Sequence, residues 1–130
     1  MRFDYSESGA LYLQIAKMLE DGILQGIYLP GEAVPSTNEL AREYSINPAT
    51  AAKGINLLVE QEILYKKRGI GMFVASDAPQ RIQTKRQGLF YDSYIVEVVQ
   101  EGLRLGLSAQ QMNQMIEKAA QQLQDKEGKA

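Results

Sequence analysis

The chain has 130 residues and a hydrophobic fraction of 45%, which fits one compact domain or a small domain with an appendage. The sequence contains neither cysteine nor histidine, which excludes disulfides and thiolate zinc sites and removes the commonest metal ligand and general base. Its formal net charge is −2 and neither half is basic overall, so binding to nucleic acid would have to rely on locally clustered cations.

Membrane insertion and secretion are not expected from this sequence. No apolar run reaches the roughly 18 residues of a membrane span, and the amino-terminal residues lack the apolar core of a signal peptide. The sequence also carries no nucleophile, phosphate-loop, dinucleotide or metal motif. We therefore expect a cytoplasmic protein that is not an enzyme and uses no cofactor or metal.

The first predicted element is a helix over residues 11–25. Its apolar positions recur every three or four residues, whereas Glu20 falls largely on the polar side. Gly26 follows the helix and, with Pro30 and Gly31, turns the chain. The face expected to pack into a core consists of Tyr12, Ile15, Leu19 and Ile23.

A short second helix is predicted from Ser36 to Tyr44. Ser36 and Glu39 have the spacing of a capping box, in which the serine oxygen accepts from the amide three residues on and the glutamate reaches back. Leu40 and Ala41 then face the core. Only residues 45–47 separate this helix from the next, and two helices joined by so short a turn indicate a helix-turn-helix.

The third predicted helix is the one around which the chain is organised. Asn47 is placed to cap its first turn, and Pro48 suits its first position. The pattern alone is typical of an amphipathic surface helix, but after a helix and a short turn it also fits a recognition helix with Thr50 and Lys53 near base edges. Its apolar stripe consists of Ala51, Ile55, Leu58 and Val59.

Two β-prone runs, Ile63–Tyr65 and Met72–Val74, flank a glycine-containing basic loop and predict a hairpin. Such a tip can simply aid solubility, but directly after a helix-turn-helix we interpret it as a wing that touches the DNA backbone. Residues 1–76 are therefore predicted to form a winged helix-turn-helix domain of three helices and a β-hairpin. The wing residues expected at DNA are Lys66, Lys67, Arg68 and Gly69.

A boundary is predicted at Ser76–Pro79, and residues 77–130 are expected to form two helices, the first ending at Gly106. Ser108 and Gln111 open the second with another capping box. The pair is expected to enclose little volume for a ligand, and its apolar residues exceed what two helices can cover. We therefore predict a two-helix dimerisation tail whose interface comprises Phe90, Tyr91, Tyr94, Ile95, Val98, Met112, Met115 and Ile116.

Several linked motifs within residues 8–75 resemble the DNA-binding domain of the GntR family of bacterial transcription regulators. They are Leu11-Tyr12-Leu13-Gln14-Ile15-Ala16, Gly26–Glu32, Val34–Ala41 and Gly69–Val74. The short tail, together with Ile46-Asn47-Pro48 at the start of the third helix, is similar to the YtrA subfamily. This resemblance implies a dimeric repressor, often of ABC-transporter genes, whose partners are double-stranded operator DNA and a second copy of itself.

The resemblance also implies which residues contact DNA. Family members usually carry arginine at the positions of Asn38 and Ile70 and a basic residue near Ala52, so the contacts here fall to other side chains. Glu62 likewise replaces a common helix-ending glycine. The predicted DNA-binding residues are Ser36, Asn38, Asn47, Ala49, Thr50, Lys53, Lys66, Lys67, Arg68 and Gly69.

Two other functions stay open on the sequence. The acidic balance and the missing arginines keep open a winged-helix module that binds a protein partner without specific DNA binding. An effector-responsive regulator would differ in having a ligand site in residues 77–130. Genomic neighbourhood and a selection of bound DNA sequences together separate these functions.

Overall fold

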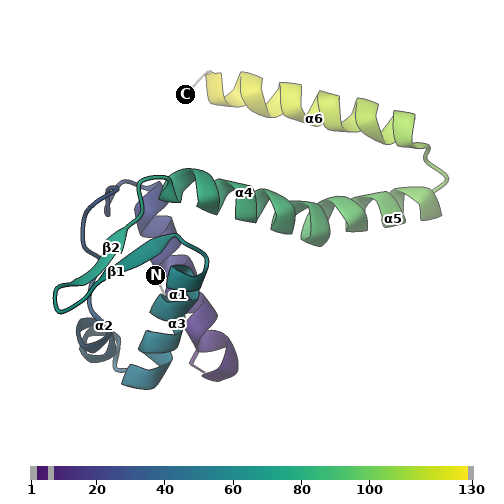
Figure 1. The fold of residues 1–130 in the computed structure, drawn as a ribbon. Helices are drawn as coiled ribbons and strands as arrows, with labels where there is room; N and C mark the ends of the chain where they lie inside the picture. Colours follow the sequence, from purple (N-terminus) through teal and green to yellow (C-terminus); the bar gives the residue numbers. More distant parts are fainter. Residues whose placement is uncertain (1–2, 6–7, 129–130) are drawn as a thin grey trace. The chain divides into compact units, whose positions relative to one another are not determined.

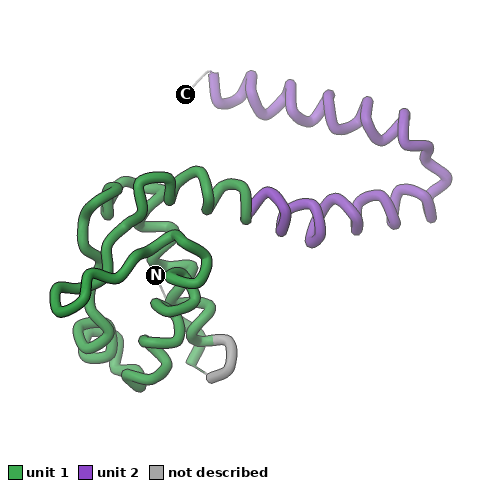
Figure 2. The backbone as a smooth tube through the Cα atoms, viewed as in Figure 1, with its two compact units in different colours: residues 1–85 green, residues 86–130 purple. Residues whose placement is uncertain are grey.

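The computed structural model describes residues 3–5 and 8–128 and divides into two compact units, residues 1–85 and 86–130 (Figures 1 and 2). Unit 1 contains a winged helix-turn-helix and unit 2 is helical, which confirms the predicted fold class. The boundary between the units falls inside α4 (Ala78–Phe90). The other elements are α1 (Ser8–Leu24), α2 (Thr37–Tyr44), α3 (Pro48–Glu60), β1 (Leu64–Lys67), β2 (Gly71–Val74), the π-helical turn η1 (Tyr91–Ile95), α5 (Val96–Arg104) and α6 (Ala109–Gly128).

Side-chain caps fix where α2 and α3 begin, as the sequence predicts. Ser36 Oγ accepts from the amide of Glu39, and Glu39 Oε1 accepts from the amide of Ser36, each at 3.1 Å. Asn47 Oδ1 accepts from the amide of Ala49 at 2.8 Å, while Pro48 begins α3. Because these caps satisfy backbone donors that would otherwise lack partners, they hold the turn between the two helices to its short length.

Helices α1, α3 and α5 end in the same backbone arrangement, a residue in the left-handed region followed by a hydrogen bond back across the last turn. Gly26 (φ 79°) and Gly106 (φ 78°) occupy this position after α1 and α5. After α3 it is held by Glu62 (φ 61°), and the amide of Ile63 donates to the carbonyl of Leu58 at 2.9 Å. The recognition helix therefore keeps a glycine-type ending without a glycine.

The wing is a two-stranded antiparallel sheet in which Tyr65 pairs with Phe73 and Lys67 with Gly71. The segment before α2 lies along the other edge of β2. Ala33 forms a bridge to Phe73, and the amide of Val34 donates to the carbonyl of Met72 at 3.0 Å. This extra pairing fastens the base of the wing to the body of unit 1.

The core of unit 1 lies between α1, α2, α3 and the base of the wing, and it also takes in the start of α4. Ala78 and Ile82 of α4 are fully buried. The predicted boundary at residues 76–79 thus marks the start of a helix, and the first turns of that helix belong to unit 1. The largest fully buried side chains are Ile15, Leu19, Leu40, Ile55, Leu58, Ile63, Leu64, Val74 and Ile82.

Glu20 does not lie on the polar side of α1 as predicted, because only 3% of its surface is exposed. Its Oε2 accepts from Nζ of Lys85 in α4 at 2.7 Å, and the same Nζ donates to Oε1 of Gln61 at 2.8 Å. One turn earlier in α4, Arg81 pairs with Glu62 at 3.2 Å. Two cations of α4 therefore hold the carboxyl-terminal end of the recognition helix.

Unit 2 has little interior of its own. Among its described residues only Gly102 and Met112 are buried, and the sulfur of Met112 lies against Gly102. The capping box at the start of α6 is present, with Ser108 Oγ accepting from the amide of Gln111 at 3.1 Å. None of the helices in the described part of the chain is long and apolar enough to cross a membrane.

Candidate nucleic-acid interface

Helix α3 presents two contrasting faces. Ala51, Ile55 and Leu58 are fully buried against the rest of unit 1. On the opposite side Ala49 and Lys53 are exposed and Thr50 is half-buried. The helix thus offers one cation and small side chains to a partner, which is the surface that can approach base edges in a major groove.

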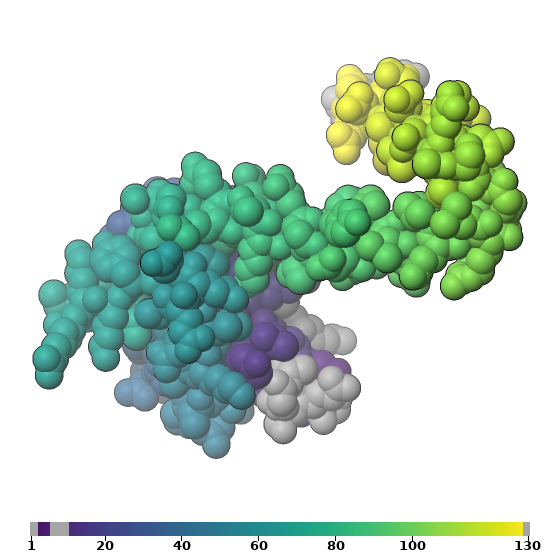
Figure 3. Space-filling view, turned by 45° about the vertical axis from the view of Figure 1, so that its right-hand side comes forward, coloured from purple at the N-terminus to yellow at the C-terminus, as the bar shows by residue number. Residues whose placement is uncertain are grey.

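The remaining predicted DNA-binding residues come from α2, the turn and the wing. In Figures 1 and 3 the wing, α2 and the amino-terminal end of α3 lie along one edge of unit 1. Asn38 in the first turn of α2 is exposed, and so are the wing residues Lys66, Arg68 and Gly69. The fold therefore brings the three predicted segments to one side of unit 1.

Ser36 and Asn47 serve first as helix caps, so their side-chain oxygens already accept backbone hydrogen bonds. The Ser36 hydroxyl and the Asn47 amide group remain able to donate. The backbone amide of Ser36, with its hydroxyl, lowers the pKa of Glu39 below its ordinary value. The capping hydrogen bonds thus favour the ionised Glu39 carboxylate at the amino-terminal end of α2, where the helix dipole also favours negative charge.

Lys53 does not extend straight into solvent from α3. Its Nζ lies 4.2 Å from the centroid of the Tyr12 ring in α1, within the range of a cation–π contact. The sequence places Tyr12 only on the apolar face of α1 and gives no sign of this pairing. The contact depends on how α1 and α3 cross, which a one-dimensional pattern does not contain.

The wing cations have different surroundings. Lys67 folds back along the sheet, with its Nζ 4.3 Å from the Phe73 ring centroid, and that ring stacks on Tyr65. Gly69 (φ 76°) supplies the left-handed residue that the hairpin tip requires. Next to it, Ile70 is 74% exposed. The tip therefore combines exposed cations with one protruding apolar side chain.

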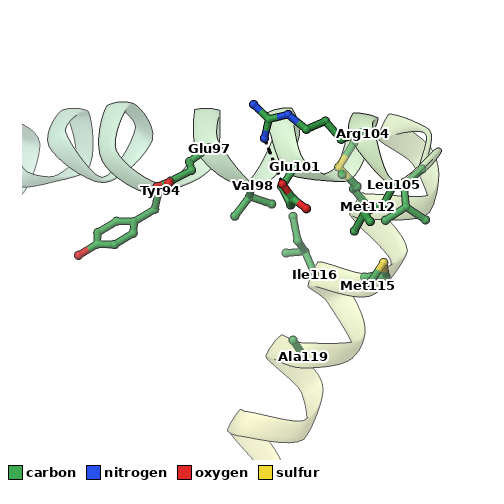
Figure 4. Close-up of a pocket in the computed structure, with 12 residues that line it drawn as sticks. Tyr94, Glu97, Val98, Glu101, Arg104, Leu105, Met112, Met115, Ile116 and Ala119 are labelled. Carbon is green, nitrogen blue, oxygen red and sulfur yellow. Dashed lines mark hydrogen bonds and ion pairs between the residues drawn. The ribbon is translucent and has the colours of Figure 1, made fainter.

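Five of the eight predicted interface residues of unit 2 line a groove between α5 and α6 (Figure 4), namely Tyr94, Val98, Met112, Met115 and Ile116. The groove has a volume of about 660 Å³, larger than the sequence leads us to expect, but it is open to solvent and the two helices border this space without enclosing it. Val98, Tyr94 and Ile116 point into the open side, and Tyr94 is 62% exposed. Met112 differs from the other predicted residues because it is already buried against Gly102, and we assign it to packing between α5 and α6.

The rest of the predicted set flanks this groove on α4 and η1. Phe90 and Tyr91 are more than half exposed, and the Phe90 and Tyr94 rings lie 5.6 Å apart between centroids. Ile95 is half-buried. As for inorganic ligands, residues 3–5 and 8–128 contain no group of three acidic, histidine or cysteine side chains that could hold a metal ion.

Comparison with known proteins adds three findings. The family model described as "Bacterial regulatory proteins, gntR family" matches residues 11–74, which span the helix-turn-helix and the wing. The chain is 36% identical over 74 residues to the HTH-type transcriptional regulator YurK of Bacillus subtilis, covering 57% of this chain and 31% of YurK. It is 32% identical over 78 residues to the HTH-type transcriptional repressor YtrA of Bacillus subtilis, covering 60% of both.

Among solved structures, a GntR-family transcriptional regulator from Bacteroides thetaiotaomicron superposes with a TM-score of 0.73 at 35% identity. That match covers 88% of this chain and 99% of the other. By contrast, the chain spans about a third of the length of YurK. The match to YtrA supports the predicted subfamily, since it extends over the same share of both proteins.

Proposed function

The chain belongs to the GntR family of bacterial regulatory proteins, and we propose that it is a homodimeric, cytoplasmic repressor that binds a specific double-stranded operator. Each subunit places α3 in a major groove and its wing on the adjacent backbone. By its resemblance to the YtrA subfamily, its targets are ABC-transporter genes. Repression then results from occupancy of the operator.

One observation carries the DNA-binding part of this proposal. Helix α3 is buried along Ala51, Ile55 and Leu58 while its amino-terminal outer side is open, and the cation-bearing wing stands on the same edge of unit 1. A chain with net charge −2 can bind DNA only if its cations are grouped in this way. Lys53, Lys66, Lys67 and Arg68 are exposed cations of that edge.

The exposed apolar residues of unit 2 support the dimer. Tyr94, Val98, Met115 and Ile116 are each about half exposed or more, and they border one groove. An apolar surface of this kind is costly to leave in water, and burial gains about 25 cal/mol per Å² before association entropy is subtracted. A second copy of unit 2 offers the same surface in return, as a two-fold interface requires.

Selection of bound sequences from a random double-stranded DNA pool tests the proposal with the full chain. We expect enrichment of a two-fold symmetric site whose half-sites lie about one helical turn apart or a multiple of it. A protein-interaction module would enrich no sequence. Recovery of an asymmetric single half-site would contradict the dimer while leaving DNA binding intact.

The salt dependence of binding to the selected site tests the wing. Lys66→Ala with Arg68→Ala removes two cations per subunit, so a dimer should lose up to four phosphate contacts and the slope of log K against log salt should flatten by roughly 3 to 4. Lys118→Ala with Lys126→Ala removes the same charge from α6 and should leave the slope unchanged. Equal slopes for both variants would remove the wing from the interface.

The groove between α5 and α6 also has the volume of a small-molecule pocket. A small apolar effector would have to compete with the partner subunit for the same residues. Such a compound would shift the chain toward monomer as its concentration rises. The dimer proposal predicts that the groove is covered in solution and that the monomer–dimer equilibrium alone controls access to it.

A further inference from the structure

Lys53 is the one cation of the recognition helix, and its ammonium group lies over the aromatic ring of Tyr12. Lys53 is exposed, yet its Nζ lies 4.2 Å from the Tyr12 ring centroid in the neighbouring helix α1. Tyr12 is half-buried, so its ring is held in place by the body of unit 1. A flexible side chain thus meets a fixed surface beside the proposed DNA-binding edge.

The crossing of α1 and α3 accounts for this contact. Gly54 follows Lys53 at the crossing point, where a β-carbon would lie 2.8 Å from the carbonyl oxygen of Tyr12 and 3.0 Å from Cγ2 of Ile15. Only glycine allows the two backbones to come so close. The preceding residue of α3 is therefore brought directly beside the Tyr12 side chain.

A lysine side chain carries about 2 kcal/mol of rotamer entropy, part of which is lost when its ammonium group binds a partner. Contact with an aromatic face restrains the chain before binding and occupies no hydrogen-bond acceptor. The ammonium group can still donate to a phosphate oxygen or to a guanine edge. Restraint of the Lys53 side chain before binding increases affinity, because the side chain loses less conformational entropy when it binds DNA.

We propose that Tyr12 is a positioning residue for DNA recognition, which holds the Lys53 ammonium group in the place from which it contacts the operator. This inference rests on the proposed function, since it assigns a second residue to the same interface. Tyr12 itself touches no DNA in this scheme. Its ring acts only through Lys53, and the hydroxyl group has no part in it.

Two substitutions at Tyr12 distinguish a role of its aromatic face from a role of its size alone. Tyr12→Phe keeps the ring and should bind the selected operator as the wild type does. Tyr12→Leu keeps an apolar side chain without a π face and should weaken binding about two- to fivefold. In a Lys53→Ala background, Tyr12→Leu should cause no further loss. Thermal denaturation of each variant checks that the domain stays folded.

The outcome that overturns the proposal is an equal loss from Tyr12→Leu with and without Lys53, because that result would make Tyr12 a structural residue only. A second readout needs no DNA. In the free full-length protein, the side-chain methylene protons of Lys53 should resonate upfield of those of other lysines, and Tyr12→Leu should abolish the shift. Absence of the shift in the wild type would also overturn the proposal.

These readouts distinguish the failure of this inference from failure of the proposed function. A wild-type chain that enriches no DNA sequence would contradict the proposed function, and this inference with it. A chain that enriches an operator but shows no coupling between Tyr12 and Lys53 would contradict this inference alone.

Discussion

The two units of the chain bury their apolar residues to very different extents. Unit 1 encloses nine large side chains almost completely, including Ile15, Ile55 and Ile82. In the described part of unit 2 the only buried side chain is Met112, while Leu103, Tyr94 and Ile116 remain at least half exposed. The difference indicates that unit 1 is complete as a folded body, and it is the reason we propose that a second copy covers the open surface of unit 2.

The largest expected effect is a loss of dimerisation and of operator affinity when charged side chains are placed on the exposed apolar surface of unit 2. Tyr94 and Val98 lie one turn apart and are both exposed, so Tyr94→Asp with Val98→Asp should leave the single chain folded. In an interface the two carboxylates would be buried at high cost, and the dimer should dissociate. Operator affinity should then fall at least about a hundredfold, because linked half-sites no longer act together.

Fluorescence anisotropy with labelled operator measures this loss. The control is Asn113→Asp with Gln114→Asp, which adds the same charge at exposed positions of α6 outside the groove. The control protein should remain dimeric and bind normally. If both variants lost affinity equally, general electrostatic repulsion from DNA would explain the result and the interface assignment would fail.

The second-largest expected effect is on the free energy of unfolding of unit 1, and it shows where this unit ends. A fragment of residues 1–76 lacks Ala78 and Ile82, which are fully buried, and it lacks Lys85 beside the buried Glu20 carboxylate. Its unfolding free energy should be lower than that of residues 1–85 by about 4 kcal/mol or more. Urea denaturation of the two fragments measures the difference. Coincident unfolding curves would show that α4 is not part of the unit 1 core.

Removing only the contacts of Lys85 with Glu20 and Gln61 should lower the free energy of unfolding by less than removing the start of α4. Lys85→Met removes the ammonium group from Glu20 and Gln61 while keeping most of the side-chain volume. Because 30% of the Lys85 side chain is exposed, we expect a loss of about 2 kcal/mol rather than the larger cost of a fully buried pair. The double variant Glu20→Met with Lys85→Met should recover most of it.

Lys118→Met on α6 is the matched control for this substitution, since Lys118 is exposed. Its unfolding free energy should remain within about 0.5 kcal/mol of the wild type. Chemical denaturation reports both values. A loss for Lys118→Met equal to that for Lys85→Met would mean that the buried contact contributes nothing specific.

The smallest effect is a gain in stability at the end of the recognition helix. Glu62 has φ 61°, and relief of this left-handed conformation by Glu62→Gly should outweigh loss of its exposed pair with Arg81. We expect a net gain of about 0.5 kcal/mol, seen as a melting temperature higher by about 2–4 °C. Ala52→Gly, in the interior of α3, should instead cost about 1 kcal/mol. Destabilisation by both would refute the strain at Glu62.

The sequence predicts those parts of the fold that depend on neighbouring residues. The caps at Ser36 and Asn47 and the apolar stripe of α3 follow from spacings of a few residues, and the structure has them all. Features that depend on distant residues were missed. Glu20 has a polar side chain on an amphipathic helix, and nothing local reveals that Lys85 will cover it.

The same reason explains what the sequence could and could not say about the candidate site. Lys53 is identified from its place on α3, but its contact with Tyr12 requires the close crossing at Gly54. The groove of unit 2 was underestimated because its volume depends on the turn between α5 and α6, where Gly106 sets the path of the chain. The periodicity of apolar residues predicts which face of a helix is buried. It does not predict how close two helices come to each other.

Sedimentation equilibrium of the full chain and of residues 1–85, each over a range of micromolar concentrations, tests the contrast between the units most directly. We predict that the full chain is a dimer and that residues 1–85 are a folded monomer, because the exposed apolar groove lies entirely in residues 86–130. A monomeric full chain, or a dimer formed by residues 1–85, would contradict the account.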